Sequence, residues 1–600
     1  MNRFYYDGPF LIANKKQIYL FIIAVLTIGI TRSMNTVMEV SNREIASKLL
    51  LISQLLEITG DNPFKIRAFN RAADAIDRVN KPVAVMDEEE LRHVPGIGMA
   101  ISQKVREIVE TGTCHELEEL RAKVPPSLIE LLNLEGVGPK TIAVLWKKMN
   151  IQSINDLEKA ATGRRIRSLK GFGEKKERGF LRSIALYRAA GGRMNRFEAE
   201  AVVDALAGVL TPGTWVVAGS YRRGKSTIGD IDIVTTESPS VINPKLRNSV
   251  DEVIDEGERR TSVRALGQRV DIRFTNERQS GSMLIYLTGS KEFNIRLREI
   301  AIEKGRKVNE YGVEERADGK LHEFSNEKDM FAFLGLQYII PELRENLGEI
   351  ELARNYQLPQ LVSPTDIRGD LHVHSDWSDG SLTLERLAMK GEALGYNYIL
   401  CSDHSATLGI THGLDEKRLQ QQSHEIERVN RMGGTCTLLH GTEVDILSNG
   451  SLGLPNHALS ELDLVIASVH SGLKEERDSM TRRVIMALEN ENVDIIGHPT
   501  GRLLGKRPAF EIDMSRVIDR ASETGTSLEC NASPWRLDLD NADIRNSKDK
   551  GVLISIGTDT HHEDEFSNMR YGITIAKRGW CGAKDIVNSL TLQELLDWAS

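Results

Sequence analysis

The sequence predicts a multidomain protein with an all-α front, an α+β middle and a seven-stranded β/α barrel at the carboxyl end. Glycine hairpins separate amphipathic helices in the first third of the chain. Aspartates lie on short apolar strands in the middle. Seven apolar runs in the last third each end in a residue able to bind a metal ion. At 600 residues the chain suits roughly four domains, at about 150 residues each.

The composition is that of an ordinary globular protein, with 40% hydrophobic and 27% charged residues. Five cysteines form no CxxC pair, which suits a reducing cytoplasm and argues against a disulfide scaffold or a zinc finger. Residues 41–190 hold 25 Lys+Arg against 20 Asp+Glu, although the whole chain has a net charge of −9. This basic front indicates a polyanionic partner, but a solvated surface explains it equally well.

Residues 18–30 form a continuous apolar run of 13 residues. A bilayer-spanning helix needs about 20 residues, so the run is too short to cross a membrane. Met34 and Met38 lie just before a polar helical start. We therefore expect residues 1–37 to be an extension from a start codon assigned too early, with a membrane-associating segment as the alternative.

Glycine hairpins recur in the front third. VPGIGMAISQKV at 94–105 is repeated as LEGVGPKTIAVL at 134–145 and, more loosely, as LKGFGEKKERGF at 169–180. Each turn leads into a helix whose first backbone N–H groups can hold a DNA phosphate without reading bases. The candidate phosphate-binding glycines are Gly96, Gly98, Gly136 and Gly138. The alternative is a helical corner used only for packing.

This pattern resembles the helix-hairpin-helix modules of DNA repair proteins. Residues 62–76 and the first hairpin also resemble the amino-terminal lyase domain of family X DNA polymerases. The resemblance implies that Lys104 attacks the C1′ of an abasic sugar, and that Lys65 and Arg71 contact the 5′-phosphate. Phe69 and Ala100 replace a tyrosine and a second lysine of the family, so we expect weak lyase activity.

Three aspartates mark the middle of the chain. In TWVVAGSYRRGKSTIGDIDIV at 214–234, Asp230 and Asp232 fall on one face of a strand, because side chains alternate along a strand. Asp271 lies on a further strand, QRVDIRF. Three converging carboxylates do not all stay ionised without cations. Two Mg²⁺ ions fit such a site and would activate a 3′-hydroxyl and stabilise a leaving pyrophosphate.

A basic helical turn stands between these strands, where triphosphate oxygens would lie. It contains Gly219, Ser220, Arg222 and Arg223. Together these motifs resemble the nucleotidyltransferase signature of family X DNA polymerases, over residues 40–350. The resemblance implies a sugar-gate turn at Tyr286 and Gly289, a base contact at Asn294 and a template contact at Arg298. Leu287 replaces the usual aromatic residue, which leaves ribonucleotide exclusion open.

Seven apolar runs in the last third are separated mostly by helical stretches. They are GDLHVHS, YILCSDHS, TLLHGTEVDI, LVIASVHS, VDIIGHPTG, TSLECNAS and ISIGTDTHH. A β/α barrel brings the carboxyl ends of its strands to one rim. The residues expected to converge there are His372, His374, Asp379, His404, Glu443, His470, His498, Asp559 and His561. Nine ligands exceed what one ion takes, so we expect up to three ions.

This part resembles the polymerase-and-histidinol-phosphatase (PHP) domain of bacterial and archaeal family X polymerases. The resemblance implies one ion on His372, His374, Glu443 and Asp559, a second on Glu443, His470 and His498, and a third on Asp379, His404 and His561. It also implies a phosphate contact at Arg502. The mixed nitrogen and oxygen ligands suit Mn²⁺ or Zn²⁺.

These patterns predict a monomeric, cytoplasmic DNA polymerase that fills short gaps in base excision repair and degrades 3′ ends. Its expected partners are gapped or nicked duplex DNA and dNTPs, with no stable membrane partner. The alternatives are a DNA-binding fusion with a small-molecule phosphatase, and a non-enzymatic DNA-end scaffold.

The expected domains are an extension at 1–37, a lyase-like domain at 38–125, a helix-hairpin-helix domain at 126–195, a palm at 196–277, a nucleotide-selection subdomain at 278–350, a linker at 351–366 and the PHP domain at 367–600.

Overall fold

The fold is described from a computed structural model, which covers residues 42–77, 79, 81, 83–134, 136–169, 171–189, 193–407 and 411–599. The extension expected at 1–37 lies outside these residues. The chain divides into two compact units, residues 1–126 and 127–600, which are described one at a time. Within the described residues, no helix is long and apolar enough to cross a membrane.

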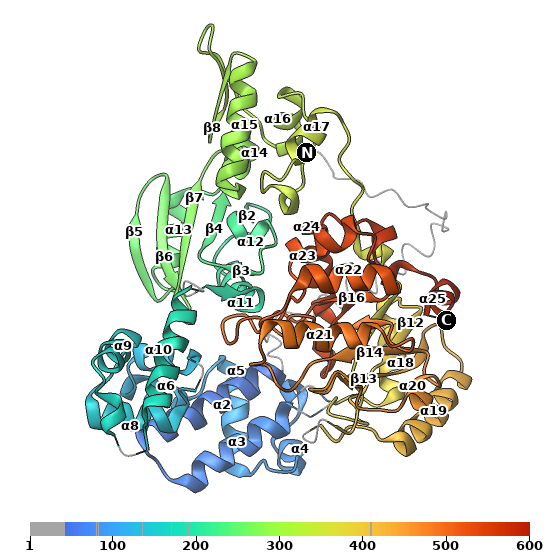
Figure 1. The fold of residues 1–600 in the computed structure, drawn as a ribbon. Coiled ribbons are helices and arrows are strands. Elements are labelled where there is room, and N and C mark those ends of the chain that lie inside the picture. The colour runs from blue at the N-terminus through green and yellow to red at the C-terminus, as the bar shows by residue number, and fades with distance from the viewer. Residues whose placement is uncertain are drawn as a thin grey trace, which may run out of the picture. The chain divides into compact units, whose positions relative to one another are not determined.

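The first unit is all helical, as predicted (Figure 1). Its α-helices are α2 (Asn42–Thr59), α3 (Pro63–Asp77), α4 (Glu88–His93), α5 (Met99–Thr111) and α6 (His115–Lys123). The apolar residues that recur on α2 at helical spacing are fully buried, among them Ile45, Leu49 and Ile52. Gly96 has a φ of +97°, which permits the hairpin turn, and Gly98 is the N-cap of α5.

The second unit begins with further helices and glycine turns. These helices are α8 (Pro139–Met149), α9 (Ile154–Thr162) and α10 (Glu174–Ala189). Gly136 and Gly171 have φ values of +78° and +86°, and Gly138 is the N-cap of α8. The three predicted turns between helices are therefore present.

A five-stranded sheet with the strand order β2-β4-β7-β6-β5 follows. Its strands are β2 (Trp215–Val217), β4 (Ile231–Thr235), β5 (Glu252–Glu256), β6 (Arg260–Ala265) and β7 (Gln268–Phe274). Ile231 and Ile233 on β4, with Val270 and Ile272 on β7, share a buried core with α11 (Arg196–Ala207) and α13 (Pro239–Leu246). The alternate residues of β4 and β7 therefore face away from these helices.

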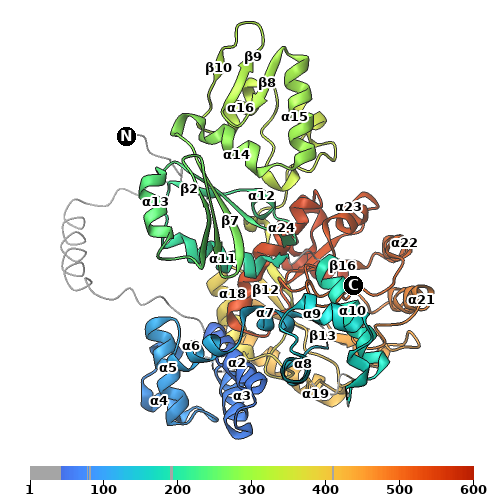
Figure 2. The same cartoon turned by 90° about the vertical axis from the view of Figure 1, so that its left-hand side faces the viewer.

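The next segment is a smaller lobe with a three-stranded sheet, ordered β10-β9-β8. It contains α14 (Ser280–Thr288), α15 (Lys291–Glu303), β8 (Arg306–Asn309), β9 (Gly312–Glu315), β10 (Leu321–His322), α16 (Glu327–Phe333) and α17 (Glu349–Arg354). Figure 2 shows α15 beside this sheet. Arg344 is fully buried and donates to Glu327 at 2.7 Å.

The carboxyl-terminal third is a parallel seven-stranded sheet in chain order. Its strands are β11 (Gly369–Val373), β12 (Tyr398–Cys401), β13 (Thr437–Asp445), β14 (Leu464–Ser468), β15 (Ile495–Ile496), β16 (Ser527–Asn531) and β17 (Ile554–Gly557). A parallel bridge between Val373 and Thr560 joins the two ends of the sheet. The predicted seven-stranded barrel is confirmed, with each strand in one of the seven apolar runs.

The barrel contacts the five-stranded domain through α24 (Met569–Arg578). Buried Arg578 donates to the backbone carbonyl of Arg223 at 2.6 Å and to Glu345 at 3.0 Å. Arg570 donates to Glu200 on α11 at 2.6 Å, and the Tyr571 hydroxyl donates to the same carboxylate. Polar contacts therefore join the two domains in addition to the covalent connection.

We expect Asp494→Asn to stabilise the barrel at neutral and alkaline pH. Asp494 precedes β15 and accepts a hydrogen bond from the Val465 backbone N–H at 2.8 Å, and burial raises its pKa to about 7. The folded state therefore holds this proton more tightly than the unfolded state does. The resulting part of the free energy of unfolding is lost as the pH rises from about 4, where the unfolded carboxyl ionises, to about 7, where the folded one ionises. Asparagine keeps an acceptor without a charge. Thermal unfolding should show a gain in Tm that grows from pH 4 to pH 7; a gain independent of pH would contradict the assignment.

Candidate active sites

The three aspartates predicted to bind metal lie together at one end of the five-stranded sheet. Asp232 on β4 is the register partner of Asp271 on the neighbouring parallel strand β7, and Asp230 directly precedes β4. Burial, together with the charges of Asp230 and Asp271, raises the pKa of Asp232 to about 6. A site with this mutual repulsion is relieved by divalent cations with oxygen ligands.

The helical turn α12 (Gly219–Arg222) begins directly against these carboxylates. Gly219 has a φ of +61°, and a Cβ at this position would overlap the Oδ2 atom of Asp232. Only glycine therefore allows this close approach. The predicted phosphate contact Ser220 follows immediately on the same turn.

Both arginines of this turn are held by carboxylates from the following lobe. Arg222 donates to the two carboxylate oxygens of Glu327 at 2.7 Å each, and Arg223 donates to Glu345 at 3.1 Å. Burial opposes ionisation of Glu327, but the bond from Arg222 and the charge of Arg344 hold its pKa at about 2. A triphosphate contact by either arginine would compete with these pairs, and that role stays a prediction.

The predicted nucleotide-selection residues lie where α14 meets α15. Gly289 has a φ of +67° and ends α14. The Asn294 amide nitrogen donates to the backbone carbonyl of Tyr286 at 2.7 Å. The predicted template contact, Arg298, is exposed on α15. Their roles toward a nucleotide stay predictions.

In the first unit, the predicted lyase lysine and a predicted 5′-phosphate contact meet at one carboxylate. Lys65 Nζ lies 2.6 Å from Oε1 of Glu116, and Lys104 Nζ lies 3.1 Å from its Oε2. Arg71 is exposed on α3, and its backbone carbonyl faces Gly96. Sequence reasoning missed Glu116, because nothing in HELEEL at 115–120 distinguishes it from the acidic residues around it.

The nine residues predicted as metal ligands converge at the carboxyl ends of the barrel strands. Glu443 on β13 is central: its carboxylate lies 2.9 Å from His404 Nδ1, 2.9 Å from His498 Nε2 and 3.2 Å from His470 Nε2. Three groups have ligand atoms within 4.8 Å of one another: His374, Asp379, His404 and His561; His372, His374 and Asp559; and His404, Glu443 and His470. The geometry brings the nine together, and their division among ions stays a prediction.

The donor set fits divalent cations. His372 Nε2 and both ring nitrogens of His374 are buried and have no hydrogen-bond partner. A buried polar atom without a partner costs about 1–3 kcal/mol. Cations between these imidazoles and carboxylates would satisfy the unpartnered atoms together. Nitrogen and oxygen donors in this mixture suit Mn²⁺ or Zn²⁺.

Comparison with known proteins identifies the family of this chain. Four family models match it: a helix-hairpin-helix domain at 40–114, a SAM-like helix-hairpin-helix tandem at 128–179, a DNA polymerase beta palm at 193–275 and a DNA polymerase beta thumb at 283–345. It is 35% identical to the DNA polymerase/3'-5' exonuclease PolX of Bacillus subtilis (strain 168) over 566 residues, which cover 92% of this chain and 98% of that protein. The chain belongs to the PolX family of DNA polymerases.

Two further relatives resemble parts of this PolX-family chain. DNA polymerase lambda of Rattus norvegicus is 28% identical over 339 residues, which cover 51% of the chain and 56% of that protein. A probable phosphatase of Thermoanaerobacter sp. (strain X514) is 29% identical over 220 residues, which cover 35% of the chain and 84% of that protein.

Two carboxylates that sequence reasoning missed contact histidines that are predicted to bind metal in this PolX-family chain. Glu529 Oε1 on β16 lies 2.6 Å from His372 Nδ1, and Asp445 Oδ1 lies 2.7 Å from His470 Nδ1. Such contacts fix the ring tautomer and direct the opposite nitrogen to a metal. Glu529 also gives the sixth apolar run, TSLECNAS, a role at the rim. The only signal in the sequence was an acidic residue inside an otherwise small and apolar strand.

Arg536 is a further residue that sequence reasoning missed. Its Nε atom lies 3.3 Å from Oδ2 of Asp559. The predicted phosphate contact Arg502 instead donates to the backbone carbonyls of Arg536, at 3.0 Å, and Leu537. Arg502 therefore holds the loop that carries Arg536, and its own contact with a phosphate stays a prediction.

We expect Glu529→Gln to weaken metal binding at the barrel about 10- to 100-fold, the effect typical of losing such a carboxylate. Glutamine keeps the shape of Glu529 but offers His372 a neutral partner in place of a charge. The measurement is the Mn²⁺ concentration that gives half-maximal 3′ degradation, together with the metal content after dialysis. Glu523→Gln, an exposed residue on α22 (Met514–Thr524), is the control. Equal metal requirements in both variants would contradict the orienting role.

Proposed function

We propose that this PolX-family polymerase fills short gaps during base excision repair, and that its barrel removes nucleotides from 3′ ends. The observation that supports this most is the presence of two complete metal-capable sites in one chain. One has three aspartates beside a glycine-based helical turn, and the other has nine His, Asp and Glu ligands at a barrel rim. The DNA polymerase/3'-5' exonuclease of B. subtilis, similar over nearly the full length, supports the same pair of activities.

For nucleotide addition, we assign Asp230, Asp232 and Asp271 to two Mg²⁺ ions. Bound there, such ions would activate the primer 3′-hydroxyl and neutralise the leaving pyrophosphate. The backbone of Gly219 and Ser220 holds the incoming triphosphate against these carboxylates. The helix-hairpin-helix turns hold the phosphates of gapped or nicked DNA.

For 3′ degradation, we assign the barrel rim to as many as three Mn²⁺ or Zn²⁺ ions. Such ions would make a water acidic enough to attack a phosphodiester near neutral pH. Glu529 and Asp445 keep His372 and His470 turned to the site. Arg536 places a positive charge beside Asp559, where it can hold a phosphate of the strand.

A gapped duplex with a labelled primer tests both activities in one assay. We expect primer extension to fill the gap when Mg²⁺ and dNTPs are present, and primer shortening when dNTPs are left out and Mn²⁺ is added. Failure to extend would overturn the polymerase proposal. Failure to shorten would overturn the nuclease proposal alone.

A second candidate function for the barrel is small-molecule phosphatase activity, which the similarity to a probable phosphatase favours. The two candidates differ in the bond that is broken, because a phosphatase cleaves a monoester and an exonuclease cleaves a diester. Hydrolysis of p-nitrophenyl phosphate at a rate far above that of a DNA 3′ end would favour the phosphatase.

We also propose weak 5′-deoxyribose-phosphate lyase activity through Lys104. Its ion pair with Glu116 lies beside Lys65, so a 5′-phosphate entering this cluster would displace the carboxylate and approach both amines. Borohydride trapping on a 5′-incised abasic duplex should fall about tenfold or more in Lys104→Ala. Lys148→Ala, on α8, is the control. Equal trapping by Lys104→Ala and the wild type would show that another amine is responsible.

The finer expectations on state and location also remain proposals. We propose that the protein acts as a monomer in the cytoplasm. All five cysteines are buried free thiols, which supports a reducing compartment.

A further inference from the structure

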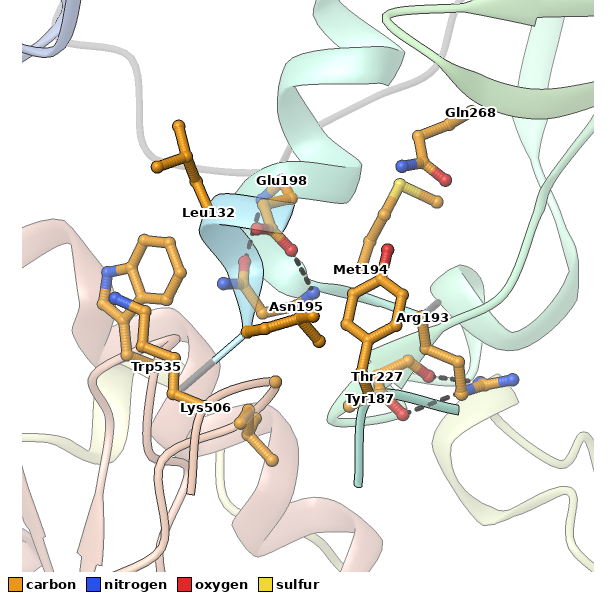
Figure 3. A pocket seen from close by; sticks show the side chains of 13 residues that line it. Leu132, Tyr187, Arg193, Met194, Asn195, Glu198, Thr227, Gln268, Lys506 and Trp535 are labelled. Carbon is orange, nitrogen blue, oxygen red and sulfur yellow. Dashed lines mark hydrogen bonds between the residues drawn. The ribbon is translucent and has the colours of Figure 1, made fainter. Parts of the chain in front are cut away.

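A cavity of about 300 Å³ lies in the second unit, between the five-stranded domain and the barrel (Figure 3). The five-stranded domain contributes β1 (Met194–Asn195), the start of α11 and Gln268. The barrel contributes residues 504–506 and Trp535. Figure 3 shows Trp535 and Lys506 on one side and Tyr187, Arg193 and Gln268 on the other, with Asn195 between them.

The cavity is joined by short stretches of chain to both candidate active sites. Gln268 lies three residues before Asp271 on β7, a separation of about 10 Å along a strand. Trp535 directly precedes Arg536, whose Nε atom is 3.3 Å from the barrel ligand Asp559. The cavity wall is therefore built partly from the two segments that carry Asp271 and Arg536.

One buried donor in the wall has no partner. Asn195 is only 3% exposed; its Oδ1 accepts the Glu198 backbone N–H at 2.9 Å, which caps α11. Its Nδ2 atom is buried and has no hydrogen-bond partner. Buried donors are normally paired, so this atom points to a ligand with an acceptor.

The barrel residues of the wall offer an aromatic ring and a positive charge. Lys506 Nζ lies 4.5 Å from the centroid of the Trp535 ring. The position of this ring is fixed: the Leu504 backbone N–H donates to the Trp535 carbonyl at 2.7 Å, and Phe197 on α11 lies 6.3 Å away, centroid to centroid. Aromatic rings with nearby cations bind single-stranded nucleic acid, because bases stack on the ring and the cation holds the phosphate.

We propose that this cavity binds the unpaired base at the 3′ end of a DNA strand on its way from the polymerase site to the barrel. The proposal rests on the proposed 3′-degrading function. Trp535 stacks on the base, Asn195 Nδ2 donates to one of its ring or carbonyl acceptors, and Lys506 moves to the adjoining phosphate. A paired base has its acceptors occupied and its faces stacked in the duplex, so the cavity selects frayed or mismatched ends for removal.

The test uses the full-length protein with a primer that carries 2-aminopurine at a mismatched 3′ end, in Ca²⁺ to suppress hydrolysis. Stacking on Trp535 should quench the fluorescence of the bound probe, and Trp535→Leu should restore it. With Mn²⁺, we expect degradation of the mismatched end to fall about tenfold in Trp535→Leu. Trp535→Phe should recover most of the rate. Tyr356→Leu, which replaces an exposed aromatic residue outside the cavity, is the control.

Asn195→Asp is the second variant, because it keeps the oxygen that caps α11 and replaces the unpartnered donor with a carboxylate oxygen, which only accepts. It should also lower mismatch removal, while both variants still hydrolyse thymidine 5′-(p-nitrophenyl phosphate), which tests the metal site without a DNA strand. Unchanged quenching or unchanged degradation in both variants would overturn the base-binding proposal. A wild type that quenches the probe but degrades no 3′ end would overturn the nuclease proposal and leave the base site supported.

Discussion

Asp232→Asn is expected to abolish nucleotide addition, lowering the rate of single-nucleotide insertion at a gap by about 10³-fold or more, equivalent to about 4 kcal/mol of barrier. Asp232 is central to the carboxylate site, since it is opposite Asp271 on the adjacent strand and follows Asp230 by two residues. Asparagine keeps the volume but loses the charge that holds two cations close together. Insertion into a one-nucleotide gap, with a labelled primer, measures the loss.

DNA binding should survive in the same variant, because the helix-hairpin-helix turns lie elsewhere in the chain. Fluorescence anisotropy with a gapped duplex should give a Kd within about twofold of the wild type. Asp255→Asn, an exposed residue on β5, is the control for loss of a surface carboxylate. Near wild-type insertion by Asp232→Asn would show that the five-stranded sheet is not the polymerase site.

Local patterns in the sequence predicted the elements that carry the sites. The seven barrel strands are short apolar runs that end in polar residues, and such runs signal buried parallel strands. Asp232 could be predicted on the open face of β4 because Ile231 and Ile233 alternate with it. The outer strand β5 was not predicted, because its residues are mostly charged and exposed and carry no apolar period.

The partners of charged residues were much harder to predict. Arg222 pairs with Glu327, which is 105 residues away, and Glu529 contacts His372 from a distance of 157 residues. Residue type suggests that a buried charge has a partner but does not identify it. Arg502 and Arg536 illustrate the same limit. The Arg502 side chain donates to the backbone carbonyl of Arg536, and it is the Arg536 guanidinium that faces Asp559.

The double variant His372→Ala/His374→Ala is expected to lose 3′ degradation by about 10³-fold or more while gap filling continues. The two rings lie two residues apart at the end of β11, His372 within the strand and His374 just after it, and each places a nitrogen within 3.7 Å of both Glu443 and Asp559. In the variant, Glu443 and Asp559 lose histidine neighbours that hold the pKa values of these carboxyls well below the usual range. Burial acts in the opposite direction and raises both pKa values. Metal content after dialysis should fall together with the nuclease activity.

Gap filling decides between a catalytic and a merely structural metal cluster. The candidate polymerase aspartates lie on a separate sheet, so a catalytic role predicts a folded protein that polymerises normally and no longer shortens 3′ ends. A structural role predicts that the barrel unfolds, which circular dichroism and the Tm would report. His424→Ala/His457→Ala is the matched control, because these two histidines are exposed on the barrel away from the rim cluster. Undiminished 3′ degradation in the first double variant would place the nuclease outside the barrel rim, because that variant lacks two of the nine predicted metal ligands.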